Sequence, residues 1–72
     1  MGTLTFEERA EEYQWASDTA FDGIRLEVLS SGGDVLFDVS VPDRGPITVD
    51  TFGKDVAANL LMVAIEVAQR PR

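Results

Sequence analysis

A narrow apolar stripe with helical spacing runs through the first quarter of the chain. Its members, at spacings of four, three and three residues, are Phe6, Ala10, Tyr13 and Ala16. Thr5 and Glu8 have the spacing of a capping box, in which each side chain accepts from the other residue's backbone amide at a helix N-terminus. Four glutamates fall away from the stripe. The pattern predicts an amphipathic helix over residues 5–18.

The middle of the chain alternates apolar and polar residues with the period of a strand. Residues 24–28 and 35–41 each place their apolar side chains on one face. The glycines of residues 30–34 favour a hairpin between them. Residues 42–46 hold two prolines and a glycine and end the second strand, and residues 47–49 resemble a short third strand at an edge.

The last segment, residues 55–69, is apolar around most of a helical circumference. Asp55, Asn59 and Glu66 form its only hydrophilic stripe, which predicts a helix covered on more than one side. The sheet and the first helix can supply that cover, or else a second subunit must. Pro71 is expected to end the helix.

These elements predict a single domain over residues 1–72, of α+β class and α-β-β-β-α order. Two helices would pack on one face of a three-stranded antiparallel meander. The expected core consists of Phe6, Tyr13, Leu26, Val28, Phe37, Val39, Val49, Val56, Leu60, Val63 and Val67.

The charge is strongly negative and unevenly distributed. Thirteen acidic residues face six basic ones, for a net charge of −7. Six of the acids and only one base lie in residues 1–22. Direct binding to nucleic acid or to a membrane is therefore not expected, because both need cationic patches. A basic or nucleic-acid-binding protein is the natural partner.

The residue types present argue against catalysis. Cysteine and histidine are absent, which removes disulfides, thiolate metal sites and the commonest catalytic base. Asp18 and Asp22 precede Gly23 but lack the middle ligand of a calcium loop. We expect no enzyme activity, cofactor or metal. No apolar run is long enough to span a bilayer and no signal peptide is visible, so the expected location is cytoplasmic.

The acidic residues of the first third are the candidate partner-binding site. They could occupy a cationic groove in place of the phosphates of a nucleic acid. In size and charge the chain is similar to small inhibitors made by phages, including anti-CRISPR proteins. The candidate residues are Glu7, Glu8, Glu11, Glu12, Asp18 and Asp22. The alternative interpretation of the same glutamates is a solvated helix face that favours solubility.

Residues 35–68 resemble the core of HicB-type antitoxins. In that core a strand ends near Pro-Asp, a turn with glycine follows, and Asp-Thr after a second strand opens an apolar helix. Pro42-Asp43, Gly45 and Asp50-Thr51 occupy those places. Two features depart from that core: Val49 replaces the glycine usual before Asp-Thr, and a predicted helix precedes the first strand. No DNA-binding segment follows the last helix either. The resemblance implies a regulatory module that binds a small basic toxin.

A third hypothesis is a structural subunit. The apolar last helix and Trp15 would then form an interface, in a homodimer or in a larger assembly.

Overall fold

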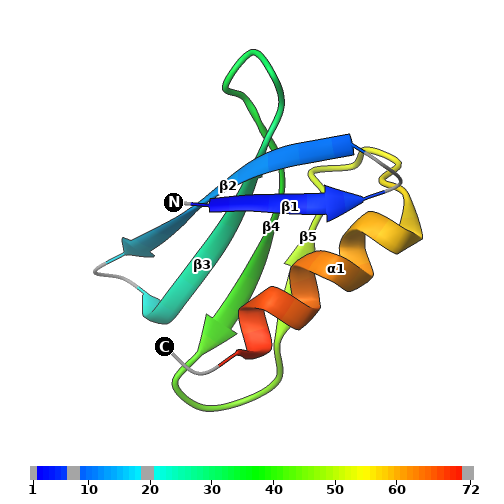
Figure 1. Cartoon of the computed structure of the whole chain (residues 1–72). Helices are drawn as coiled ribbons and strands as arrows, with labels where there is room; N and C mark the ends of the chain where they lie inside the picture. Colours follow the sequence, from blue (N-terminus) through cyan, green and yellow to red (C-terminus); the bar gives the residue numbers. More distant parts are fainter. Residues whose placement is uncertain (1, 7–8, 19–20, 71–72) are drawn as a thin grey trace.

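The chain folds into five strands followed by one helix. The computed structural model describes residues 2–6, 9–18 and 21–70 (Figure 1). The elements in chain order are β1 (Gly2–Phe6), β2 (Arg9–Asp18), β3 (Phe21–Leu29), β4 (Val35–Pro42), β5 (Thr48–Asp50) and α1 (Ala58–Gln69).

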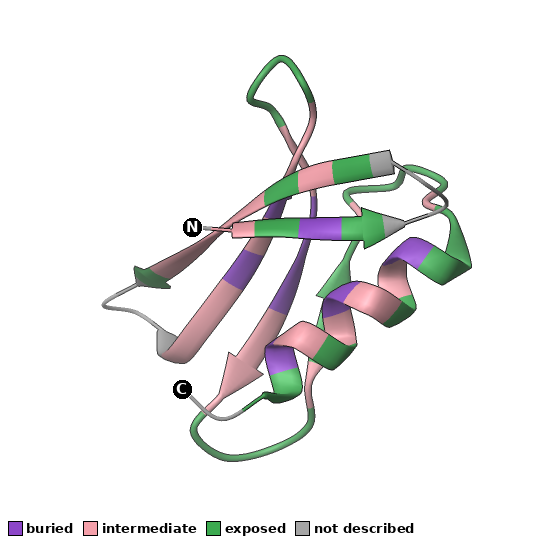
Figure 2. Ribbon diagram, viewed as in Figure 1, coloured by how far each residue is buried: buried purple, intermediate pink, exposed green. Residues whose placement is uncertain are grey.

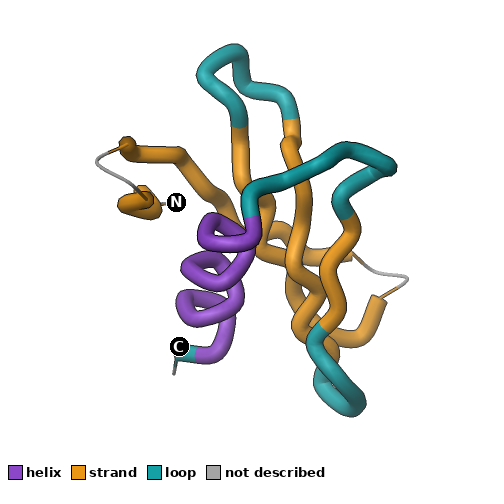
Figure 3. The backbone as a smooth tube through the Cα atoms, turned by 90° about the vertical axis from the view of Figure 1, so that its right-hand side faces the viewer, coloured by secondary structure: helices purple, strands orange, loops and turns teal. Residues whose placement is uncertain are grey.

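The strands form one antiparallel sheet in the order β1-β2-β3-β4-β5, so every strand pairs with its neighbours in the sequence. The register of the pairing shifts between Ser17 and Asp18 and again between Val28 and Leu29, as at a β-bulge or a similar irregularity. The single helix contacts β1, β3 and β4 and lies along one face of the sheet (Figure 3). No helix of the described residues lies on the other face.

The predicted α-β-β-β-α order and the two-helix layer are wrong, because the predicted N-terminal helix is a pair of strands. Within β2, Tyr13 and Trp15 lie on the same face at a spacing of two, and their rings meet edge to face with centroids 6.5 Å apart. The alanines and glutamates of this segment have high helix propensity, but β2 pairs with β1 along residues 9–13 and with β3 along residues 12–18. Of the predicted capping box, Thr5 lies in extended β1 and Glu8 falls outside the described residues.

The remaining elements agree with the sequence pattern in type. The strands predicted over 24–28 and 35–41 lie within β3 and β4, and the predicted third strand is β5. The last helix is confirmed, but it begins three residues later than predicted. Ala57 precedes it without any side-chain capping hydrogen bond. No helix in the described part of the chain is long and apolar enough to cross a membrane.

The hydrophobic core lies between the sheet and α1 (Figure 2). Its buried residues are Leu4, Leu26, Val28, Phe37, Val39, Leu60, Ala64 and Ala68. Five of these were predicted. Of the other predicted core residues, Val49 is 36% exposed and the Phe6 side chain falls outside the description, and four are only partly buried. Those four are Tyr13, Val56, Val63 and Val67.

Leu4, Ala64 and Ala68 were not expected in the core. The two alanines lie four residues apart on α1 and let the helix backbone approach the sheet closely. Leu4 enters the core because residues 2–6 are a strand, whose alternate side chains point toward α1.

Candidate functional site

The predicted acidic helix face does not exist, because adjacent residues of a strand point to opposite faces of the sheet. Glu11 pairs with buried Leu4 and is half-buried on the face that carries α1. Glu12 is exposed on the opposite face. Glu7 and Glu8 lie outside the described residues, as do the side chains of Asp18 and Asp22. The role of these six acids in binding stays a prediction.

The structure instead aligns three other acids on the face without a helix. Glu27 of β3 lies directly opposite Asp38 of β4, and Asp38 lies directly opposite Asp50 of β5. We call these three residues the carboxylate row. Side chains that face each other in this way have Cβ atoms about 4.5–5.5 Å apart. Gln14 of β2 extends the row, since its Nε2 donates to Glu27 Oε1 at 2.7 Å.

Asp38 is the central member of the row and is only 9% exposed. Within the described chain its carboxylate has no hydrogen bond and no ion pair. No side-chain nitrogen or oxygen there is fully buried without a partner, so the Asp38 oxygens still open to solvent. Burial raises the pKa of Asp38 above its ordinary value, Arg25 opposes that shift, and Asp50 and Glu27 add to it.

The row is a line of carboxylates and does not enclose an ion. Neighbouring strands lie about 4.8 Å apart, so the three groups spread across the sheet. Among the described residues, no group of three or more potential ligands has the geometry to hold a metal ion. The arrangement suits several cationic side chains placed over the sheet.

Sequence reasoning missed the row although its members lie at polar positions of alternating segments. Glu27 and Asp38 are visible there as residues of the polar faces of their strands. Their pairing depends on the register of the hairpin between them, which the bulge at Val28 and Leu29 shifts by one residue. A bulge of this kind leaves no clear mark in the sequence.

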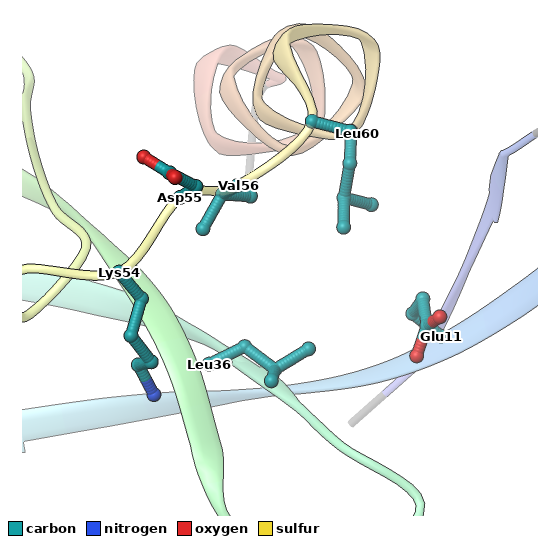
Figure 4. Close-up of a pocket in the computed structure, with 7 residues that line it drawn as sticks. Glu11, Leu36, Lys54, Asp55, Val56 and Leu60 are labelled. Atoms are coloured by element: carbon teal, nitrogen blue, oxygen red, sulfur yellow. The ribbon is translucent and has the colours of Figure 1, made fainter.

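A mainly apolar pocket of ≈ 210 Å³ lies between β2 and the start of α1 (Figure 4). Leu36, Val56 and Leu60 provide its apolar lining. Glu11 lies on one side and Lys54 on the other, whereas the Asp55 carboxylate points away (Figure 4). Lys54 Nζ donates to the Val35 carbonyl at 3.2 Å and lies 5.8 Å from the centroid of the Phe52 ring.

A strained turn follows the row at its β5 end. Phe52 and Gly53 have φ angles of 56° and 78°, and the Lys54 amide donates to the Thr51 carbonyl at 3.0 Å. These values define a type I′ turn. Asp50 Oδ1 accepts from the Phe52 amide at 2.8 Å and so fixes the turn. Phe52 therefore presents a ring that is 50% exposed from a left-handed conformation that phenylalanine rarely adopts.

The strain at Phe52 can be measured by substitution. Asn-Gly is the preferred pair for a type I′ turn, so Phe52→Asn is expected to raise the free energy of unfolding by about 0.5–1 kcal/mol. Phe52→Ala is the control, because it removes the same ring but lacks the short polar side chain that lets Asn adopt the left-handed region. Urea denaturation of the three proteins provides the measurement. Equal stabilisation by both substitutions would assign the gain to loss of the exposed ring and not to backbone strain.

The Asp38 carboxyl predicts an unusual dependence of stability on pH. Because its folded pKa is raised above 3.8, the folded state holds the proton more tightly than the unfolded chain. This group's contribution to stability therefore falls as the pH rises from 3.8 through the folded pKa, and its full cost is present at pH 7. Asp38→Asn is expected to stabilise the protein at pH 7, by about 0.2–1 kcal/mol for each relieved cross-strand repulsion.

The stabilisation by Asp38→Asn should shrink toward zero below the ordinary aspartate pKa of 3.8. Urea denaturation of the wild type and the variant across the acidic range measures this. Asp43→Asn removes an equal charge at an exposed position and serves as the control. A stability difference that does not change with pH would contradict the raised pKa.

No protein-family model, curated protein or solved structure matches this chain.

Proposed function

We propose that this protein is a non-catalytic binding domain whose carboxylate row docks onto a basic surface of another protein. The observation that carries the proposal is Asp38, a residue only 9% exposed whose carboxylate opens to solvent between two other carboxylates of the described chain. Like charges directly opposite each other destabilise a sheet by about 0.2–1 kcal/mol. At Asp38, burial together with the repulsion from Asp50 and Glu27 outweighs the attraction of Arg25, so the charged group lowers the stability of the free domain. Cationic side chains over the row would offset that effect.

Binding at Asp38 would incur a smaller desolvation cost than binding at an exposed carboxylate. The fold already displaces part of the water around this residue, so a bound cation removes less. The net charge of −7 would in addition steer a cationic partner toward the domain and speed association at low ionic strength.

The partner that we propose is a nucleic-acid-handling protein, inhibited when the row occupies its cationic groove. Such grooves present rows of Lys and Arg that match the closely spaced phosphates of nucleic acid. The row offers several negative charges on a rigid sheet, with main-chain ladders on both sides of β4. A cytoplasmic location is part of this proposal.

An antitoxin-like module is the second candidate. The order β4, β5, α1 follows the strand-turn-strand-helix order of the HicB resemblance, and Gly45 lies in the turn with a φ of 101°. Asp50-Thr51 departs from it, because these residues end β5 and enter a turn several residues before α1 begins. On this reading the basic partner would be a small toxin.

Titration with an oligo-arginine peptide, followed by calorimetry and by amide chemical shifts, tests the proposal. We expect shifts along the carboxylate row and affinity that falls steeply with salt. A triple variant, Glu27→Gln with Asp38→Asn and Asp50→Asn, should bind about tenfold more weakly, equivalent to about 1.4 kcal/mol.

A matched triple variant removes the same charge from exposed positions elsewhere. It combines Asp34→Asn, Asp43→Asn and Glu66→Gln. This control should keep its affinity within about twofold. Equal weakening in both triples would show that only net charge matters, and the row would lose its proposed role.

A further inference from the structure

The β5 edge of the sheet is open. Among the elements of the described chain, β5 contacts only β4, and all three of its residues are exposed. The opposite edge differs, because β1 contacts α1 as well as β2. β5 is the last strand in the order of the sheet. The outward backbone groups of β5 are therefore available to pair with another chain.

On both faces of the sheet, the side chains of β5 lack a neighbouring strand on their outer side. On the face without a helix, the carboxylate row ends at Asp50, with no strand beyond to carry a fourth side chain. On the core face, Val49 pairs with Val39, which is fully buried, yet Val49 is 36% exposed. The difference arises because Val39 has a strand on each side and Val49 has one only.

We propose that the partner adds an extended segment to β5, with an Arg or Lys opposite Asp50 and an apolar side chain opposite Val49. This inference rests on the proposed function and specifies how the basic partner binds. An added strand would gain main-chain hydrogen bonds, and its alternating side chains would give specificity. A basic residue opposite Asp50 would form a favourable cross-strand charge pair with it.

Charge selects a basic foreign segment over a second copy of this chain. Two copies that paired through β5 would bring together two molecules of net charge −7 and add further acids beside Asp50. The short, acidic edge thus resists self-association, which is how many proteins protect such strands. A segment that alternates basic and apolar residues is not repelled by the net negative charge and adds no acid beside Asp50.

The capped peptide TRVRVRT is the probe. We expect it to slow amide hydrogen exchange in β5 and to give NOEs between its valines and Val49. The charge-reversed peptide TEVEVET should bind at least about tenfold more weakly, a difference of about 1.4 kcal/mol. Two N-methylated forms of TRVRVRT isolate the main-chain contribution, since alternate amides of a strand face opposite edges. Methylation of one set should abolish binding, and methylation of the other should leave it unchanged.

Charge reversal at Asp50 provides the second arm. Asp50→Lys is expected to lose binding of TRVRVRT and to gain binding of TEVEVET, which a structural role of Asp50 in the turn would not produce. Amide spectra of the variant establish that it is folded. Equal effects of the two methylation patterns would overturn strand addition. Perturbations confined to β1 or α1, or a concentration-dependent dimer through β5 in the free protein, would overturn it also.

The two proposals can fail separately. If oligo-arginine binds at the carboxylate row while both methylated peptides bind like TRVRVRT, the basic partner stands and strand addition is wrong. If the neutral peptide TQVQVQT pairs with β5 as tightly as TRVRVRT, the edge accepts a strand and the basic chemistry is wrong.

Discussion

Replacement of Phe37 by alanine is expected to lower the free energy of unfolding by about 3–5 kcal/mol, the usual range for a buried Phe→Ala change. The Phe37 side chain is fully buried, and it is the largest side chain in the core. It lies on β4, near the middle of the sheet, opposite fully buried Val28. β4 is paired with β3 on one side and β5 on the other, so the sheet can relax only partly into the cavity that the substitution leaves.

The loss would be a large share of the total stability of so small a domain. At about 0.05–0.15 kcal/mol per residue, a chain of this length has about 4–11 kcal/mol. Phe52→Ala makes the same chemical change at a half-exposed position and is expected to alter stability by less than about 1 kcal/mol. Urea unfolding monitored by circular dichroism compares them. Similar losses in both variants would place Phe37 outside the core.

Leu4→Ala is expected to cost about 2–5 kcal/mol, although Leu4 lies near the start of the chain. The side chain is 1% exposed, and its strand β1 packs against α1. The substitution therefore removes a fully buried apolar group from the strand that packs against the helix. Urea unfolding again provides the measurement.

Substitutions of the two neighbours of Leu4 test whether the loss of stability depends on its place on the buried face of β1. Thr3 and Thr5 flank Leu4 on β1 and are exposed, so Thr3→Ala and Thr5→Ala should each change stability by about 0.5 kcal/mol or less. This alternation is characteristic of a strand with one buried face. A Leu4→Ala loss no larger than that of its neighbours would mean that β1 is not docked on α1.

The sequence predicts those elements whose local pattern and tertiary environment agree. In β3 and β4 the alternation is clear, and Leu26, Val28, Phe37 and Val39 all lie in the core as predicted. The C-terminal helix is equally clear, because its apolar run is too long for a strand.

The N-terminal segment was mispredicted because two periodicities overlap there. Ala10, Tyr13 and Ala16 fit a helix, whereas Tyr13 and Trp15 fit a strand. The segment is a strand because most of β2 pairs with β3. That pairing cannot be read from the residue pattern of β2 alone. The same limit applies to the candidate site. The negative charge is evident from composition, but the alignment of Glu27, Asp38 and Asp50 depends on register across three strands.

The contact between β1 and α1 joins the first and last elements of the chain. During synthesis the five strands emerge before the helix, and each can pair with the strand that precedes it. Leu4 cannot complete its packing until α1 has left the ribosome, so the nascent sheet exposes its apolar face until then. A chain whose synthesis stops before α1 should therefore bind chaperones and be degraded readily. Folding of the domain can be completed only once the helix has been synthesised.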